Sequence, residues 1–140
     1  MQRAEAEHPI SYLMLAKWLW ESGKKDDAVL WYYIGQVRAR AYVAGHPKLD
    51  PTGEPAAIGA IFATMGPPIN QYAFGDIAGL AATIDRALAW DESHPDNFTP
   101  KSPERDKVVN GLRTMKVEIL ATADDIRKSR AAKGLENRTR

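Results

Sequence analysis

Residues 23–42 decide the fold, and their sequence is Gly-Lys-Lys-Asp-Asp-Ala-Val-Leu-Trp-Tyr-Tyr-Ile-Gly-Gln-Val-Arg-Ala-Arg-Ala-Tyr. After the charged opening, every residue from 28 to 34 is apolar or aromatic. A helix on a protein surface shows one apolar stripe and one polar face, whereas this stretch has no polar face over about two turns. We therefore expect a helix over 26–44 at the centre of the molecule, with the other helices packed around it.

The composition is that of a single globular domain. A chain of 140 residues with 44% hydrophobic and 26% charged residues can bury one core without cross-links. We therefore interpret 1–140 as one domain, with flexible ends expected over 1–8 and 131–140. No apolar run approaches the roughly 20 residues of a membrane span, so no membrane partner is predicted.

The cysteine content and the first residues limit the compartment only in part. The chain contains no cysteine, which excludes disulfides and thiolate metal sites. Residues 1–7 contain no apolar segment of a signal peptide. Two interpretations remain, a cytoplasmic protein or a periplasmic protein from which a signal peptide has been removed.

The net charge of +1 conceals an uneven distribution. From residue 127 onward there are six Lys and Arg residues and one Glu, so the rest of the chain is acidic. Binding to duplex nucleic acid normally requires a basic face on the folded domain. We therefore do not expect nucleic-acid binding, and we interpret the basic end as a solvated segment.

Turn and cap residues mark the ends of the first two helices. Pro9 suits the first turn of a helix, and Gly23 suits the position just after its end. Gly45 ends the central helix, and the residues after it are rich in proline. A loop is therefore expected over 45–55.

The second half of the chain predicts further helices and no strand. A short helix is expected over 55–65, because the sequence Gly-Pro-Pro at 66–68 should break it, with a single turn over 69–74. Apolar residues repeat at steps of three and four over 76–91 and again over 102–126, where the first residue is a good N-cap serine. The predicted fold is an all-α, irregular bundle of five or six helices.

The first two helices carry a known pattern. Gly23 stands at the turn, and Ala28, Tyr32 and Gly35 give a small, aromatic, small spacing in the second helix. Over about residues 12–42 the chain resembles a helical hairpin of the tetratricopeptide or Sel1-like repeat type. The resemblance implies a protein-binding scaffold without chemistry of its own, in which each small residue lets the partner helix approach closely.

A weaker echo of the same pattern covers 75–88. The separation between Gly23 and Gly75 exceeds the roughly 34 residues of a regular array, and the residues between them are rich in proline and glycine. We therefore expect one repeat-like hairpin inside an irregular bundle rather than a solenoid.

An acidic loop over 91–97 is the first candidate site. We expect Asp91, Glu92, His94 and Asp96 to bind a partner protein there. The exposed carboxylates of Asp91, Glu92 and Asp96 should steer a basic partner. The alternative is a small metal-dependent hydrolase in which Asp91, His94 and Asp96 form the site. Because their spacing matches no calcium or zinc loop, no metal or other cofactor is predicted.

An aromatic groove is the second candidate site. Trp20, Tyr33 and Tyr42 lie close together in the sequence with Arg38 and Arg40. Aromatic and arginine side chains dominate the hot spots of protein interfaces, so these residues are candidates for binding a partner. Packing of the same aromatic rings in the core is the competing interpretation.

The chain carries none of the short motifs that indicate catalysis. It has no Gly-x-Ser-x-Gly elbow, no phosphate-binding glycine loop and no His-Glu-x-x-His pair. We therefore predict a non-catalytic protein-binding domain, and in concrete form a small stoichiometric inhibitor or immunity-type protein that blocks a toxin or an enzyme. The sequence assigns no oligomeric state.

Overall fold

The computed structural model describes residues 8–138, which form six α-helices and no strand. The helices are α1 (Pro9–Glu21), α2 (Lys25–Gly45), α3 (Glu54–Ala73), α4 (Ile77–Ser93), α5 (Pro103–Ala121) and α6 (Ala123–Ala132). The predicted irregular all-α bundle is confirmed. Residues 1–7 and 139–140, which hold part of the ends expected to be flexible, lie outside the described residues. None of the six helices is long and apolar enough to cross a membrane.

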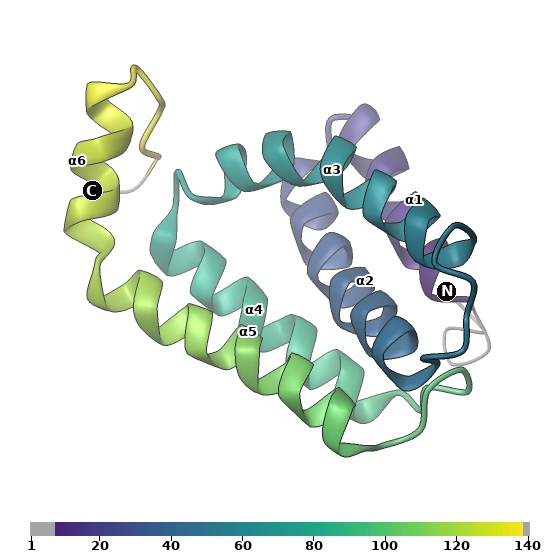
Figure 1. Cartoon of the computed structure of the whole chain (residues 1–140). Helices are drawn as coiled ribbons and strands as arrows, with labels where there is room; N and C mark the ends of the chain where they lie inside the picture. Colours follow the sequence, from purple (N-terminus) through teal and green to yellow (C-terminus); the bar gives the residue numbers. More distant parts are fainter. Residues whose placement is uncertain (1–7, 139–140) are drawn as a thin grey trace.

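α2 is the central helix, as predicted. It packs against α1 and α3 on one side and against α4 and α5 on the other (Figure 1). Tyr32, Val37 and Arg38 are each at most 2% exposed, although Arg38 carries a charge. Leu30 and Trp31 are only partly buried, so the stretch without a polar face is not enclosed on every side.

α1 and α2 form a tightly packed helical hairpin. Gly23 makes the turn with a φ of 82°, a conformation that favours glycine. A Cβ added at Gly35 would lie 2.7 Å from the side chain of Leu13 and 3.1 Å from its backbone nitrogen. The close approach expected at this small residue is therefore present.

α3 continues through the two prolines that were expected to end a shorter helix. The predicted break at residues 66–68 is wrong, and one helix covers both the expected helix and the expected turn. Proline in a helix interior costs about 3 kcal/mol. Met65 and Ile69 are buried on either side of the prolines, and the Tyr33 hydroxyl donates a hydrogen bond to Asn70 Oδ1 at 2.8 Å. These contacts with the core hold both halves of α3 in place.

The last apolar stripe is divided between two helices rather than forming one. Thr122 leaves the helical conformation with a φ of −111°, and its hydroxyl donates to the carbonyl of Glu118 at 2.8 Å. α6 begins directly after it and points away from the axis of α5 (Figure 1). The expected single helix through Ile126 is therefore wrong.

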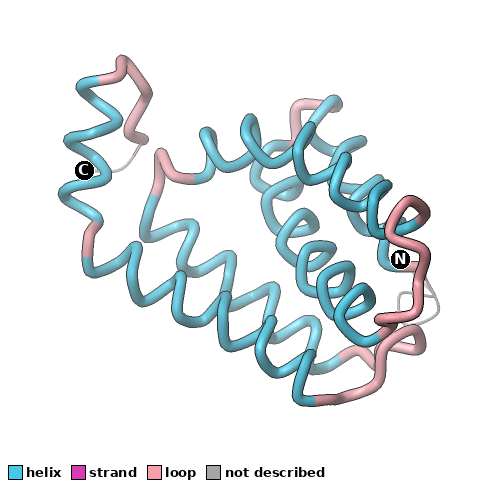
Figure 2. Tube along the Cα trace, viewed as in Figure 1, coloured by secondary structure: helices cyan, strands magenta, loops and turns pink. Residues whose placement is uncertain are grey.

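The described part of the C-terminal segment folds back onto the bundle, although a flexible end was expected over 131–140. Gly134 makes the turn after α6 with a φ of 72°. Arg138 then reaches the connection between α3 and α4, where its backbone N–H donates to the Gly75 carbonyl at 2.6 Å. Its guanidinium lies 3.7 Å from the centre of the Tyr72 ring. Figure 2 shows this return from α6 as a loop.

Gly35→Ala should destabilise the protein, because the added methyl group meets both the side chain and the backbone of Leu13. We expect the free energy of unfolding to fall by about 1–3 kcal/mol, the usual cost of overpacking. Urea denaturation followed by circular dichroism measures it. No measurable loss would contradict the tight packing of α1 on α2.

Arg138→Ala should lower the free energy of unfolding by about 1–2 kcal/mol, because the variant loses a stacked cation and the hydrogen bond from the guanidinium to the Tyr72 carbonyl. Lys133→Ala is the matched control, since it removes the same charge from an exposed position. Equal melting temperatures for the two variants would show that the returning segment adds no stability.

Candidate functional site

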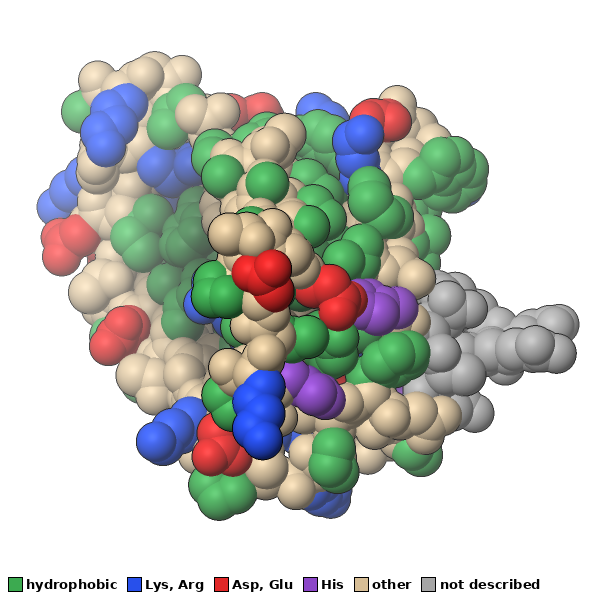
Figure 3. Space-filling model, turned by 45° about the vertical axis from the view of Figure 1, so that its right-hand side comes forward, with side chains coloured by type: hydrophobic (Ala, Val, Ile, Leu, Met, Phe, Trp, Pro, Cys, Tyr) green, Lys and Arg blue, Asp and Glu red, His purple; other side chains and the backbone are tan. Residues whose placement is uncertain are grey.

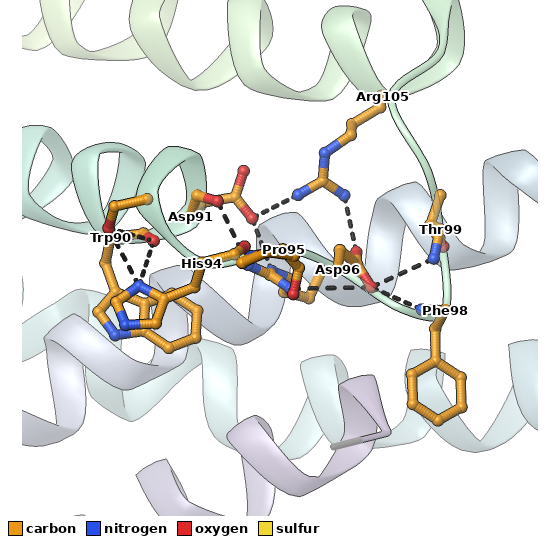
Figure 4. A network of polar contacts seen from close by, with 10 residues as sticks. Trp90, Asp91, His94, Pro95, Asp96, Phe98, Thr99 and Arg105 are labelled. Carbon is orange, nitrogen blue, oxygen red and sulfur yellow. Dashed lines mark hydrogen bonds and ion pairs between the residues drawn. The ribbon is translucent and has the colours of Figure 1, made fainter. Parts of the chain in front are cut away.

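Two arginines and two aspartates form a buried ion network beside the 91–97 loop. Arg38 comes from α2, Asp91 from α4, Asp96 from the loop and Arg105 from the first turn of α5. Arg38 Nε lies 2.6 Å from Asp91 Oδ1, and Arg105 Nη1 lies 2.8 Å from Asp96 Oδ2. Arg105 also pairs with Asp91, so both carboxylates form ion pairs with the guanidinium of Arg105 (Figure 4). Each of the four side chains is at most 8% exposed.

The guanidinium of Arg38 has partners for its remaining donors. It donates to the backbone carbonyls of Asp91, His94 and Pro95. Its charge also lies 5.0 Å from the centre of the Trp90 ring, which favours a cation. Burying a charge is costly unless it is paired and hydrogen-bonded, and Arg38 meets both conditions.

The 91–97 loop is held against the bundle rather than extended into solvent. Asp96 Oδ1 accepts hydrogen bonds from the backbone N–H groups of Phe98 and Thr99, at 3.0 and 3.1 Å. The His94 ring stacks on Trp90 with 4.2 Å between ring centres. The expectation of exposed carboxylates is therefore wrong for Asp91 and Asp96, because both form buried ion pairs with Arg38 and Arg105.

Only part of the predicted acidic site remains accessible. Glu92 is exposed and His94 is half-buried. Of the residues proposed for the alternative hydrolase site, Asp91 and Asp96 are paired with guanidinium groups. Among residues 8–138, no group of three or more His, Asp or Glu side chains is placed to hold a metal ion.

The predicted aromatic groove is not formed by the residues proposed for it. Tyr33 and Tyr42 are 1% and 8% exposed, and Arg38 belongs to the buried network. Trp20 is partly buried edge-on against Tyr72, with 5.8 Å between ring centres. Core packing, the competing interpretation, therefore describes the two tyrosines.

These tyrosines fasten α2 to α3 through their hydroxyl groups. Burial raises the pKa of Tyr33 strongly, so this hydroxyl remains a hydrogen-bond donor. Burial and a hydrogen bond to Glu54 raise the pKa of Tyr42. The same hydrogen bond lowers the pKa of the Glu54 carboxyl, because it stabilises the ionised form.

An apolar cleft lies over α2, with α3 as one wall and α5 as the other. We call it the α2–α3–α5 cleft, and its volume is about 680 Å³. It is lined by Gln36, Val37, Ala39, Arg40, Val43, Ala44, Pro55, Ile58, Gly59, Phe62, Lys107, Val108, Gly111, Leu112 and Met115. Hydrophobic side chains also gather in a hollow of the face seen in Figure 3.

The charges that line the cleft have one sign. Arg40 and Lys107 are its charged residues, and none of the lining residues is a carboxylate. The Arg40 guanidinium lies 5.3 Å from the centre of the Phe62 ring. Among residues 8–138, neither Arg40 nor Lys107 is within ion-pair distance of a carboxylate. Of the residues predicted for the aromatic groove, Arg40 is the one that lines this cleft.

Sequence reasoning missed both Arg105 and the cleft. The signal for Arg105 was its place shortly after a loop with several carboxylates. The signal for the cleft was the apolar stripe of α5, part of which lines the cleft instead of the core. Leu112 of that stripe is 7% exposed, whereas Val108 and Met115 are only partly buried and line the cleft.

No protein-family model and no solved structure matches the chain. The chain is similar to an uncharacterized protein of Haemophilus influenzae, with 30% identity over 104 residues. The alignment covers 69% of this chain and 38% of that protein, so the chain spans less than half the length of this curated relative. The interpretation of the cleft therefore depends on its geometry and charge.

Asp91→Asn should destabilise the protein severely, because it leaves two buried guanidinium groups with one carboxylate between them. Removing one partner of a buried ion pair typically costs about 3–5 kcal/mol. Glu92→Gln is the matched control, since the neighbouring carboxylate is exposed and should be replaceable without loss. Denaturant unfolding of both variants measures the difference, and similar values for the two would contradict the network as a structural element.

Proposed function

We propose that this chain is a non-catalytic protein-binding domain and that the α2–α3–α5 cleft is its binding surface. The observation that carries the proposal is an open cleft of about 680 Å³ lined by apolar side chains from three helices, with Arg40 and Lys107 beside them, which have no ion pair with a carboxylate of residues 8–138. Its lining contains no carboxylate, histidine, serine or threonine, and Lys107 is its one side chain of a type that acts as a base or nucleophile.

The composition of the cleft favours a protein segment over a small molecule. Small-molecule sites combine an apolar lining with several polar groups that converge to fix the orientation of the ligand. Gln36 is the one uncharged polar side chain in this lining. A partner that contributes a row of apolar side chains needs no such convergence, because area and shape supply the affinity.

The tetratricopeptide or Sel1-like pattern supports the same proposal. The pattern describes a closely packed helical hairpin, and Gly35 allows that packing between α1 and α2. By resemblance, such hairpins serve as protein-binding scaffolds. In concrete form, we propose a stoichiometric inhibitor or immunity-type protein that captures a segment of a toxin or an enzyme.

A photo-crosslinking phenylalanine analogue at position 115 tests the proposal, because Met115 lines the cleft and is partly accessible. In cells of the organism that encodes the chain, we expect a discrete adduct with another protein. The same analogue at position 117 is the matched control, since Val117 is 62% exposed on the same helix and does not line the cleft. Adducts of equal yield at both positions, or none at 115, would contradict the proposal.

A further inference from the structure

Two helical glycines stand on the two walls of the cleft. Gly59 belongs to α3 and Gly111 to α5. Glycine weakens a helix interior relative to alanine, so it usually serves either a special backbone conformation or close packing. Neither glycine has a positive φ, and a Cβ added at either position would meet no atom within 4 Å. The described chain therefore gives no internal reason for either glycine.

The two walls present the same spacing toward the cleft. On α3, Pro55, Ile58, Gly59 and Phe62 line it, and these positions are i, i+3, i+4 and i+7. On α5, the lining residues Val108, Gly111, Leu112 and Met115 have the same spacing. This is the face that one helix offers to another, over about two turns. At a glycine on such a face, the backbone of the neighbouring helix can come closer.

An extended segment does not suit this cleft. Extended peptides gain affinity by pairing their backbone with a sheet edge, and residues 8–138 contain no strand. In an apolar cleft between helices, the backbone N–H and C=O groups of an extended peptide would lose water without finding partners. A helix satisfies its own backbone groups before it binds, so it can bury apolar side chains without that loss.

The charge of the cleft selects the charge of its occupant. Arg40 of α2 and Lys107 of α5 line the cleft without a carboxylate partner among the described residues. Carboxylates on the occupant would pair with them and would be attracted during approach. A basic occupant would instead be repelled.

We infer that the cleft binds an acidic amphipathic α-helix of another protein, which lies over α2 between Gly59 and Gly111. The occupant places apolar side chains at i, i+3, i+4 and i+7 against the two walls and carboxylates beside Arg40 and Lys107. This inference rests on the proposed function, since it names the kind of segment that the cleft takes.

A displayed library of random 16-residue peptides is the probe for this inference. Peptides are selected on the wild-type protein and then counter-selected on the double variant Gly59→Leu/Gly111→Leu. The Cβ atom of each new side chain meets no described atom within 4 Å, and leucine is a better helix former than glycine. The double variant should therefore melt no lower than the wild type while its cleft is filled.

The expected peptides carry apolar residues at helical spacing with an excess of Asp and Glu. A synthetic copy of such a peptide should lose at least about tenfold in affinity on the double variant and a similar factor when proline is placed at its centre. Arg40→Glu/Lys107→Glu should weaken its binding in the same way, and this variant leaves the cleft unfilled. If the Gly59→Leu/Gly111→Leu variant melts at a lower temperature than the wild type, the Arg40→Glu/Lys107→Glu variant takes its place as the test.

The two levels of the proposal fail in different ways. If the peptides that need the cleft tolerate a central proline, or carry no excess of acidic residues, the inferred acidic helix is wrong and the binding function stands. If no selected peptide distinguishes the wild type from both cleft variants, the proposed binding function is itself overturned.

Discussion

The buried guanidinium of Arg38 is the interaction on which the arrangement of the helices depends. It stands on the central helix and reaches the end of α4, the carbonyls of the following loop and, through shared carboxylates, the start of α5. A guanidinium in this position is tolerated only while its charge and its donors are matched. Matching the charge and the donors of Arg38 fixes the positions of α4 and α5 relative to α2 within a smaller range than apolar packing alone would. Apolar side chains can slide past one another, whereas hydrogen bonds between charged groups are directional.

The position of α5 in turn creates the cleft. α3 is held on the other side of α2 by hydroxyl groups, those of Tyr33 and Tyr42, whose partners Asn70 and Glu54 lie near opposite ends of α3. Each wall is thus fixed to α2 by polar contacts, directly for α3 and through shared carboxylates for α5. A surface held open in this way loses little conformational entropy when it binds, which favours affinity.

Local signals in the sequence predicted the elements but not their pairing. The continuous apolar stretch placed α2 at the centre, and Gly23, Pro9 and Ser102 marked real helix boundaries, because caps and turns act within a few residues. The prolines inside α3 led to a wrong prediction of a helix break, because the core contacts that hold this part of α3 come from residues far away in the sequence. Arg38 and Asp91 are 53 residues apart, and nothing near either residue indicates that they meet.

This pairing reverses the charge that we propose for a partner. Read as free carboxylates, Asp91 and Asp96 favoured a basic partner. In the folded chain they neutralise Arg38 and Arg105, so their field outside the protein is small, because opposite charges a few ångströms apart cancel at longer distances. Arg40 and Lys107 line the α2–α3–α5 cleft without a carboxylate partner among residues 8–138, and cations attract carboxylates. The charge that we propose for a partner therefore depends on which charged side chains form ion pairs inside the protein. Counting the charges along the sequence does not reveal those pairs.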